Sequence, residues 1–438
     1  MLRDDTTVAL AGFTVMGVAE EIYKAVETRY LATGHPRALT LVHSAGQSDR
    51  VRGMPRWAHE GLLNCIIGSH WGLAPRMAEF IAANKVAAFC LPQGQIAQMY
   101  RAVAGGKPGC ISQIGLRTFV DPRVDGGRMN DLARARADVV ELISLGGQDY
   151  LWYKPLRFDT ALLRGTTADD DGNVSCEEEA ISLEILSMAQ AVKQCGGTVI
   201  VQVKRRVASG MIPPRHVAIP GILVDVVVVA QDIEDNHRQT SGAVFNPAYI
   251  SRAPVATVAS PPLALDERTL IGRRAALELR PGAIVNLGTG IPGDAVGPVA
   301  VSEGLLPHIK LTIESGTIGG IPVGGVDFGL AIGPDAIIEH PYQFDFYNGG
   351  GVDIAYMGVG EIDRWGNVNV SKLAGRTPGC GGFIDITQPA KTVVFCATFT
   401  SGGLKVGVHD GSLTIVKEGR FPKYPSTQEG YGNHAASC

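Results

Sequence analysis

Apolar and polar residues follow two recurring patterns along this chain. Residues 6–11 form a short apolar run of strand character, and a glycine-containing turn separates them from residues 18–30. Within that second stretch Val18, Ile22 and Val26 recur at helical spacing, which predicts a helix with one buried face. A strand, a turn and an amphipathic helix in this order are typical of a βα unit, so the pattern favours an α/β fold.

The same alternation returns later in the first half. Residues 161–163 predict a strand, and Ser175 followed by Glu178 has the spacing of a helix capping box. This cap predicts a helix that runs to about Lys193. Residues 198–203 are β-branched and apolar on both faces, as expected of a strand buried in a parallel sheet.

The second half of the chain repeats part of the first. Thr198 and Val199 recur as Thr392 and Val393, an offset of 194 positions. The same offset relates two longer sets of residues: Asp159, Ala161, Asp169, Gly172, Asn173 and Val174 recur as Asp353, Ala355, Asp363, Gly366, Asn367 and Val368. One offset that is kept across separate elements indicates an internal duplication.

Two related open α/β domains are therefore expected, at residues 1–252 and 263–438. The stretch 251–262 holds three prolines and no helical period, which is typical of a linker. The openings of the two halves match more loosely, at an offset of 277 positions. Because pockets are common where domains meet, the active site is expected between the two halves.

Composition narrows the class of protein. With 438 residues the chain is longer than one hydrophobic core usually serves. Lys plus Arg number 39 against 43 for Asp plus Glu, and this balance argues against nucleic-acid or membrane-surface partners, which need a basic excess. The most apolar run, 219–230, is too short to span a bilayer and contains Asp225.

Cysteine usage and the N-terminus predict a cytoplasmic protein. The eight cysteines form no Cys-x-x-Cys pair and several lie in apolar runs, which suits reduced thiols better than disulfides or zinc. The first residues are too polar for a signal peptide. His59-Glu60 begins a zinc-protease motif, but no second histidine follows at the required spacing, so no metal site is expected.

Glu314 is the first candidate for chemistry. It follows the strand-like residues 311–313 and precedes Ser-Gly and, shortly after, Gly319-Gly320. Sheets of α/β proteins bind ligands at the carboxyl ends of their strands, so this carboxylate is placed to face a cleft, although it could also simply end a strand at the surface. A carboxylate can attack an activated acyl group without a base or a metal.

Two further stretches offer hydrogen-bond donors to such a reaction. Residues 349–351 are three glycines whose backbone N–H groups are unobstructed by side chains. Gln93 lies between Pro and Gly at the end of an apolar run. Its position favours a turn residue beside a strand tip, and its amide is available to a substrate oxygen.

A dinucleotide-binding oxidoreductase is the main alternative. Gly288–Gly293 fits G-x-G-x-x-G between a predicted strand and a helix, and Glu314 would then bind a ribose. Two observations weaken this hypothesis. The N-terminal copy of the element does not keep the pattern, and Pro292 suits the first turn of a helix better than a pyrophosphate cradle.

Seven motifs make the chain similar to a known family. They are Glu314-Ser-Gly, Gly68-Ser-His-Trp-Gly-Leu-Ala-Pro75, Leu91-Pro-Gln-Gly94, Gly115-Leu-Arg-Thr-Phe-Val-Asp-Pro122, Leu163-Arg-Gly-Thr-Thr-Ala-Asp169, Gly366-Asn-Val-Asn-Val-Ser371 and Pro378-Gly-Cys-Gly-Gly-Phe383. With them the sequence resembles the family I coenzyme A transferases, in particular the single-chain acetate/propionate branch. The resemblance extends to about Arg420 and implies two α/β domains with the active site between them.

The resemblance implies a mechanism and its reactants. Glu314 would attack a short-chain acyl-CoA, form a mixed anhydride and then carry CoA as a thioester until an incoming short-chain carboxylate reverses the steps. CoA would be a substrate, with no permanently bound cofactor. A homo-oligomer is the default for such an enzyme.

The resemblance also assigns the remaining site residues. It makes Gln93 and the backbone of Gly350 and Gly351 the candidate oxyanion donors. It places five residues at the CoA pocket: Lys372, Arg376, Gly379, Gly381 and Gly382.

The end of the sequence departs from the family. Residues 424–438 are polar and rich in small residues, and they resemble a truncated end where the family continues. Either the chain works as a CoA-transferase, or it is a damaged copy with a destabilised second domain, low soluble yield and an early, broad melting transition. A third hypothesis is an inactive acyl-CoA-binding remnant, which would bind without exchanging label between acyl-CoA and free acid.

Overall fold

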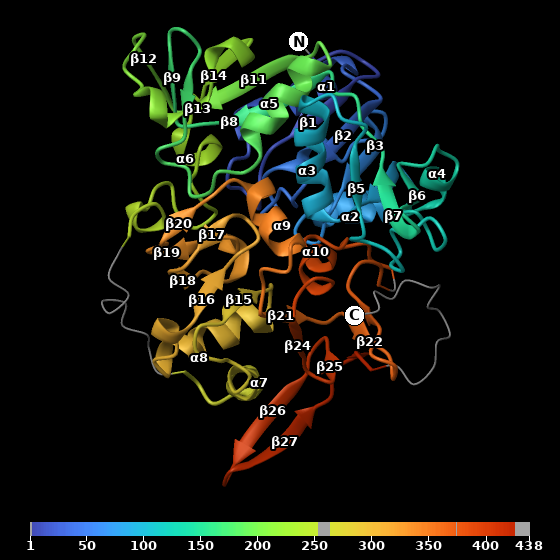
Figure 1. Cartoon of the computed structure of the whole chain (residues 1–438), viewed down its shortest axis with the longest axis vertical. Coiled ribbons are helices and arrows are strands. Elements are labelled where there is room, and N and C mark those ends of the chain that lie inside the picture. The colour runs from blue at the N-terminus through green and yellow to red at the C-terminus, as the bar shows by residue number, and fades with distance from the viewer. Residues whose placement is uncertain (1, 253–262, 374, 425–438) are drawn as a thin grey trace.

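The first half of the chain is built around a parallel sheet. The fold is that of a computed structural model, which describes residues 2–252, 263–373 and 375–424 (Figure 1). In spatial order the strands are β14 (Val226–Val229), β11 (Thr198–Val203), β8 (Thr160–Arg164), β1 (Thr7–Leu10), β2 (Leu39–His43), β3 (Leu63–Gly68) and β4 (Ala87–Cys90). All neighbouring pairs in this sheet are parallel.

Helices and two small sheets surround this first sheet. The helices are α1 (Glu20–Thr33), α2 (Pro75–Ala82), α3 (Gln93–Ala104), α4 (Asp131–Arg134), α5 (Ile185–Gln194) and α6 (Ile233–Asn236). One small sheet contains β12 (Arg205–Val207), β9 (Thr167–Asp169), β10 (Val174–Ser175) and β13 (Val217–Ile219), and the other contains β5 (Cys110–Ser112), β7 (Gln148–Tyr153) and β6 (Val140–Leu145). The interior strands are apolar on both faces because helices cover both.

The second half is built around a mixed sheet. Its order is β20 (Ala336–Ile337), β17 (Thr317–Ile318), β16 (Lys310–Thr312), β15 (Ile284–Leu287), β21 (Ile354–Gly358) and β24 (Thr392–Cys396). The last four are parallel, and β17 and β20 are antiparallel additions at one edge. Its helices are α7 (Glu267–Ala276), a π-helix (Pro292–Val296), α8 (Gly297–Ser302), α9 (His340–Asn348) and α10 (Phe383–Thr387).

Strand register confirms the internal duplication. In the first half β1 lies between β2 and β8, and in the second half β15 lies between β16 and β21. Thr198 pairs with Thr160 just as Thr392 pairs with Ile354, so both partners are displaced by the same offset. One side-chain contact is repeated as well: Asp159 accepts a hydrogen bond from the N–H of Thr7, and Asp353 accepts one from Ile284, each at 2.8 Å.

The predicted capping box is wrong. Ser175 lies in β10, and its hydroxyl donates to Glu177 at 2.7 Å rather than capping a helix. The helix begins only at Ile185, with Glu184 at its N-cap position. Pairing of β10 with β9 and β13 holds this segment extended, so the tertiary context overrides the local helix signal.

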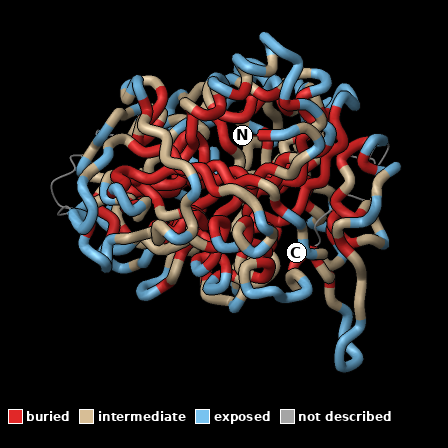
Figure 2. Tube along the Cα trace, turned by 90° about the horizontal axis from the view of Figure 1, so that it is seen from above, coloured by how far each residue is buried: buried red, intermediate tan, exposed pale blue. Residues whose placement is uncertain are grey.

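The two halves pack tightly against each other. In Figure 1, α9 and α10 lie between the two main sheets, and both contact α3 of the first half. The largest hydrophobic core cluster contains residues of both halves, such as Tyr100 and Phe344. Figure 2 shows buried positions filling the body of the molecule, with exposed positions gathered at its outer edge.

The predicted linker falls largely on residues 253–262, which lie outside the described part of the chain. Just before it, Arg252 pairs with Asp335 at 3.5 Å, so the last described residue of the first half already contacts the second. Domain boundaries at 1–252 and 263–438 remain our proposal. The predicted atypical end also lies outside the described residues from position 425 onward.

One hairpin projects from the second half. It consists of β26 (Lys405–His409) and β27 (Ser412–Lys417), which pair with each other (Figures 1 and 2). Every residue of β27 is exposed, including Leu413, Ile415 and Val416. The remaining short strands of this half are β18 (Ile321–Pro322), β19 (Ala331–Ile332), β22 (Glu361–Ile362), β23 (Val368–Asn369), β25 (Thr400–Ser401) and β28 (Phe421–Pro422).

Candidate active site

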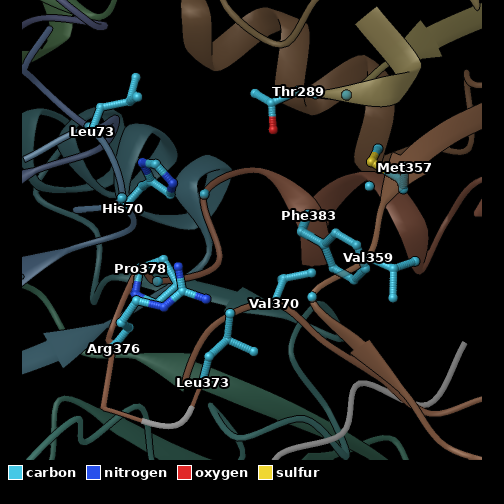
Figure 3. Close-up of a pocket in the computed structure, with 18 of the residues that line it drawn as sticks. His70, Leu73, Thr289, Met357, Val359, Val370, Leu373, Arg376, Pro378 and Phe383 are labelled. Carbon is cyan, nitrogen blue, oxygen red and sulfur yellow. The ribbon is translucent and has the colours of Figure 1, made fainter. Parts of the chain in front are cut away.

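A cavity of about 970 Å³ opens between the halves. Both halves line it: His70 and Leu73 face Thr289 and Met357 across the space in Figure 3. Glu314 is part of its lining. The cavity therefore lies at the interface that the duplication predicted.

The turn after β16 presents Glu314 to this cavity. Ser315, the next residue, is buried and donates its hydroxyl to the carbonyl of Gly329. Gly316 has φ +108°, and a Cβ there would lie 2.0 Å from the carbonyl oxygen of Ile338. Only glycine fits this close approach, and the turn carries the preceding carboxylate out of the sheet. On its other side the carboxylate meets Gly382, where a Cβ would lie 3.2 Å from Oε2 of Glu314.

Burial dominates the electrostatics of Glu314. Desolvation raises its pKa to about 7, and the nearby Asp385 adds to this shift. Burial also raises the pKa of Asp385 to about 6, against hydrogen bonds from the side chain of Gln95 and the N–H of Gly94. A carboxylate with so little water around it is a stronger nucleophile than an ordinary surface glutamate.

A pH dependence of turnover follows from this shift. Attack requires the ionised carboxylate, and a raised pKa means that ionisation is lost as the pH falls through about 7. We expect kcat to be flat above about pH 8 and to fall about tenfold per pH unit below 7. Steady-state rates measured across this range check it, with enzyme returned to pH 8 afterwards to exclude unfolding. A profile that stays flat down to about pH 5 would contradict the raised pKa.

Gln93 reaches the cavity as the first residue of α3. It is 2 % exposed, so it is a buried helix start rather than the surface turn that its neighbours favoured. Its N–H donates to the carbonyl of Gly381 at 3.1 Å, which ties the helix start to the opposite half. Its side-chain Nε2 lies 2.8 Å from Nε2 of His340.

The predicted role of Gly350 and Gly351 as oxyanion donors requires correction. Neither residue lines the cavity. Their N–H groups donate to the carbonyls of Tyr347 and Phe346, at 2.9 and 3.0 Å, and thereby end α9. A donor that is already used in a helix C-terminus cannot serve an oxyanion at Glu314.

The predicted CoA residues divide into two groups. Arg376, Gly379, Gly381 and Gly382 all line the cavity, and Arg376 is exposed at its wall (Figure 3). Lys372 does not line it, and its ammonium group lies 3.5 Å from Asp125 instead.

Gly379 must be a glycine because the backbone of the first half lies too close to it for a side chain. A Cβ on Gly379, which has φ +83°, would lie 2.3 Å from the carbonyl of Ser69. The glycine-rich loop can therefore press directly against the first half.

The G-x-G-x-x-G segment belongs to the same cavity. Gly288, Thr289 and Gly290 line it directly after β15, and the π-helix follows. The turn that the alternative hypothesis assigned to a dinucleotide is therefore part of the cavity wall. The turn does not form a second site, because it shares the cavity with Glu314.

Two buried residues beside the site were not predicted from the sequence. His340 is fully buried beside Gln93, and its Nδ1 lies 2.7 Å from Oε2 of the equally buried Glu184. Glu184 and His340 begin helices in different halves, 156 positions apart, so no local pattern connects them. Each resembles an ordinary polar residue at a helix start.

Two kinds of site are not found among the described residues. No group of three or more His, Cys, Asp or Glu side chains there could hold a metal ion. Within the same residues no helix is long and apolar enough to cross a membrane.

Fold and cavity together define an α/β enzyme built by duplication, with a desolvated carboxylate between its halves. The family model described as coenzyme A transferase matches residues 1–230. Caffeate CoA-transferase of Acetobacterium woodii is 43% identical over 97% of this chain and 81% of its own length. Acetate CoA-transferase YdiF of Escherichia coli K12 is 40% identical over 93% of this chain and 76% of its own.

The solved structures that are similar to this chain include members of the same class of enzyme. The acyl-CoA transferase YdiF apoenzyme from Escherichia coli O157:H7 has a TM-score of 0.88 and 39% identity, over 97% of this chain and 79% of that one. A second YdiF structure, described as a thioester complex with CoA, matches equally well, with a TM-score of 0.88. The chain therefore belongs to the coenzyme A transferase family and is a CoA-transferase.

Proposed function

We propose that this CoA-transferase moves CoA between a short-chain acyl-CoA and a free carboxylate through a thioester on Glu314. The observation that carries the proposal is the desolvated carboxylate of Glu314 in the cavity between the halves. The acetate CoA-transferase relative, and the thioester complex of YdiF, support both the acid class and the covalent step.

The steps balance without any further reagent. A carboxylate oxygen of Glu314 attacks the thioester carbonyl, the C–S bond breaks, and CoA leaves as a thiolate from a mixed anhydride. The thiolate then attacks the glutamyl carbonyl, which forms the Glu314–CoA thioester and releases the first acid. A second carboxylate enters and the same two steps run in reverse. CoA enters and leaves as a substrate, so the cycle needs no resident cofactor.

Two groups of residues assist Glu314 in the proposed reaction, one by stabilising the oxyanion and the other by binding CoA. The side-chain N–H of Gln93 is the oxyanion donor, because it is a buried donor at the cavity wall. Arg376 and the loop Gly379–Gly382 seat part of the CoA. Loss of one oxyanion donor typically lowers the rate about 10²–10³-fold.

The cellular setting is part of the same proposal. The seven described cysteines are free, which suits a reducing compartment, and we propose a cytoplasmic homo-oligomer.

Intact-protein mass tests the covalent step. After incubation with acetyl-CoA or propionyl-CoA we expect a mass increase equal to CoA minus one water, which disappears when acetate is added. The adduct should be absent from Glu314→Ala. Well-folded protein that forms no adduct would contradict the proposal. Binding of acyl-CoA without exchange of label into free acid would instead favour an inactive acyl-CoA-binding protein.

A further inference from the structure

A chain of buried polar groups runs from the core of the first half to the cavity. Ser44, which follows β2, donates its hydroxyl to Oε1 of Glu184. The other oxygen of Glu184 lies 2.7 Å from Nδ1 of His340, and Nε2 of His340 lies 2.8 Å from the amide nitrogen of Gln93. Glu184 and His340 are 0 % exposed, so water does not compete for these contacts.

The chemistry of the partners assigns the protons in this chain. An ionised carboxylate only accepts hydrogen bonds, so Nδ1 of His340 must carry the proton that faces Glu184. In the neutral ring Nε2 is then an acceptor. An acceptor at Nε2 requires the NH₂ end of the Gln93 amide, since the carbonyl end cannot donate. One amide hydrogen is used for His340, which leaves the second as the donor that the proposed mechanism needs at the cavity that Gln93 lines.

We propose that Glu184 and His340 are positioning residues that orient the Gln93 amide for catalysis. Glu184 selects the tautomer of His340, and that tautomer selects which end of Gln93 can face it. With the opposite tautomer, Nε2–H would attract the amide oxygen and turn the NH₂ group away from its present direction. The inference deepens the proposed function and rests on it, because it takes Gln93 as the oxyanion donor.

A purely structural role is the competing explanation. The Glu184–His340 contact joins the two halves, and the N–H of His340 also donates to the carbonyl of Leu183 at 3.1 Å. The interface has other strong contacts, however. Asp385 accepts from the N–H of Gly94 at 2.9 Å, and Arg101 pairs with Asp345 at 2.6 Å. A structural role would change stability, whereas a positioning role acts on kcat through Gln93.

Glu184→Gln separates the two roles. A glutamine amide can either donate to Nδ1 of His340 or accept from it, so the tautomer is no longer fixed. We expect kcat to fall roughly 10- to 100-fold, a part of the loss typical of a missing oxyanion donor, while KM for acyl-CoA changes less than about threefold. Glu27→Gln is the matched control, because Glu27 contacts His59 at 3.0 Å far from the cavity.

A double-mutant cycle with Gln93→Ala decides the question. If the pair acts through Gln93, then Glu184→Gln causes no further loss of kcat once Gln93 is Ala. Equal losses in both backgrounds, or an unchanged kcat with a lowered melting temperature, would overturn the inference. If Glu184→Gln does not fold, His340→Gln takes its place in the same cycle with the same expected outcome.

The proposed function and the role of Glu184 and His340 are tested by separate measurements. The CoA adduct on Glu314 is measured in the wild-type protein by mass. Absence of that adduct refutes the covalent mechanism whatever the cycle shows. A normal adduct combined with an additive cycle refutes only the role of Glu184 and His340.

Discussion

Glu314→Gln is expected to lower kcat for CoA transfer at least ~10⁴-fold, because the amide cannot attack a thioester or carry CoA. Glutamine has nearly the same shape, so its contacts with Gly382 and the turn after β16 are kept. Steady-state exchange of label between acyl-CoA and free acid measures the loss. Glu303→Gln, an exposed charge change beside Arg273, should leave kcat unchanged.

The same variant is also expected to be more stable at pH 8. The pKa of Glu314 in the folded protein is about 7 against an ordinary value of 4.5, so folding disfavours its charged form. The loss of stability caused by burying the charged carboxylate is absent below about pH 4.5. It grows as the pH rises and reaches its full size above about pH 7. Removing the charge should therefore add about 1–3 kcal/mol to the free energy of unfolding at pH 8. An inactive variant that was less stable would point to a damaged fold rather than a lost nucleophile.

Gly316→Ala is expected to cost about 3 kcal/mol or more and to abolish most turnover. The new Cβ would collide with the carbonyl of Ile338 at 2.0 Å, in a backbone conformation that favours glycine. The turn that carries Glu314 must move to relieve the collision. The free energy of unfolding and kcat should therefore both decrease. Chemical denaturation and label exchange measure the two effects.

Gly304→Ala is the matched control for this substitution. Gly304 also has a positive φ, +69°, but a Cβ there meets nothing within 4 Å. We expect a cost of about 1 kcal/mol from the backbone conformation alone, with normal turnover. Equal costs at both glycines would show that the contact with Ile338 does not matter.

Local and repeated patterns were sufficient to predict the fold. The offset that relates Asp159 to Asp353 is visible in the sequence because each aspartate binds the start of a neighbouring strand, a requirement that both copies share. The place of Glu314 in the cavity wall agrees with its position between an apolar run and a glycine. That pattern alone left a strand end at the surface as an alternative, and the family resemblance decided between the two.

Residues whose role depends on distant partners could not be predicted in this way. His340 and Glu184 meet only when the two halves pack, and neither position looks unusual in its own segment. Gly350 and Gly351 were misassigned because the sequence shows that their N–H groups are unobstructed but not that helix carbonyls already accept from them. The contact of Lys372 with Asp125 could not be predicted, because the two residues are 247 positions apart.

The projecting β26–β27 hairpin is expected to affect how the protein behaves in concentrated solution. Its two strands pair with each other, and β27 exposes Leu413, Ile415 and Val416. An exposed apolar strand offers backbone donors and acceptors to any other strand that meets it, including one from another molecule. Self-association through this hairpin would rise with protein concentration, so concentration becomes a variable to be controlled whenever rates or molecular sizes are compared.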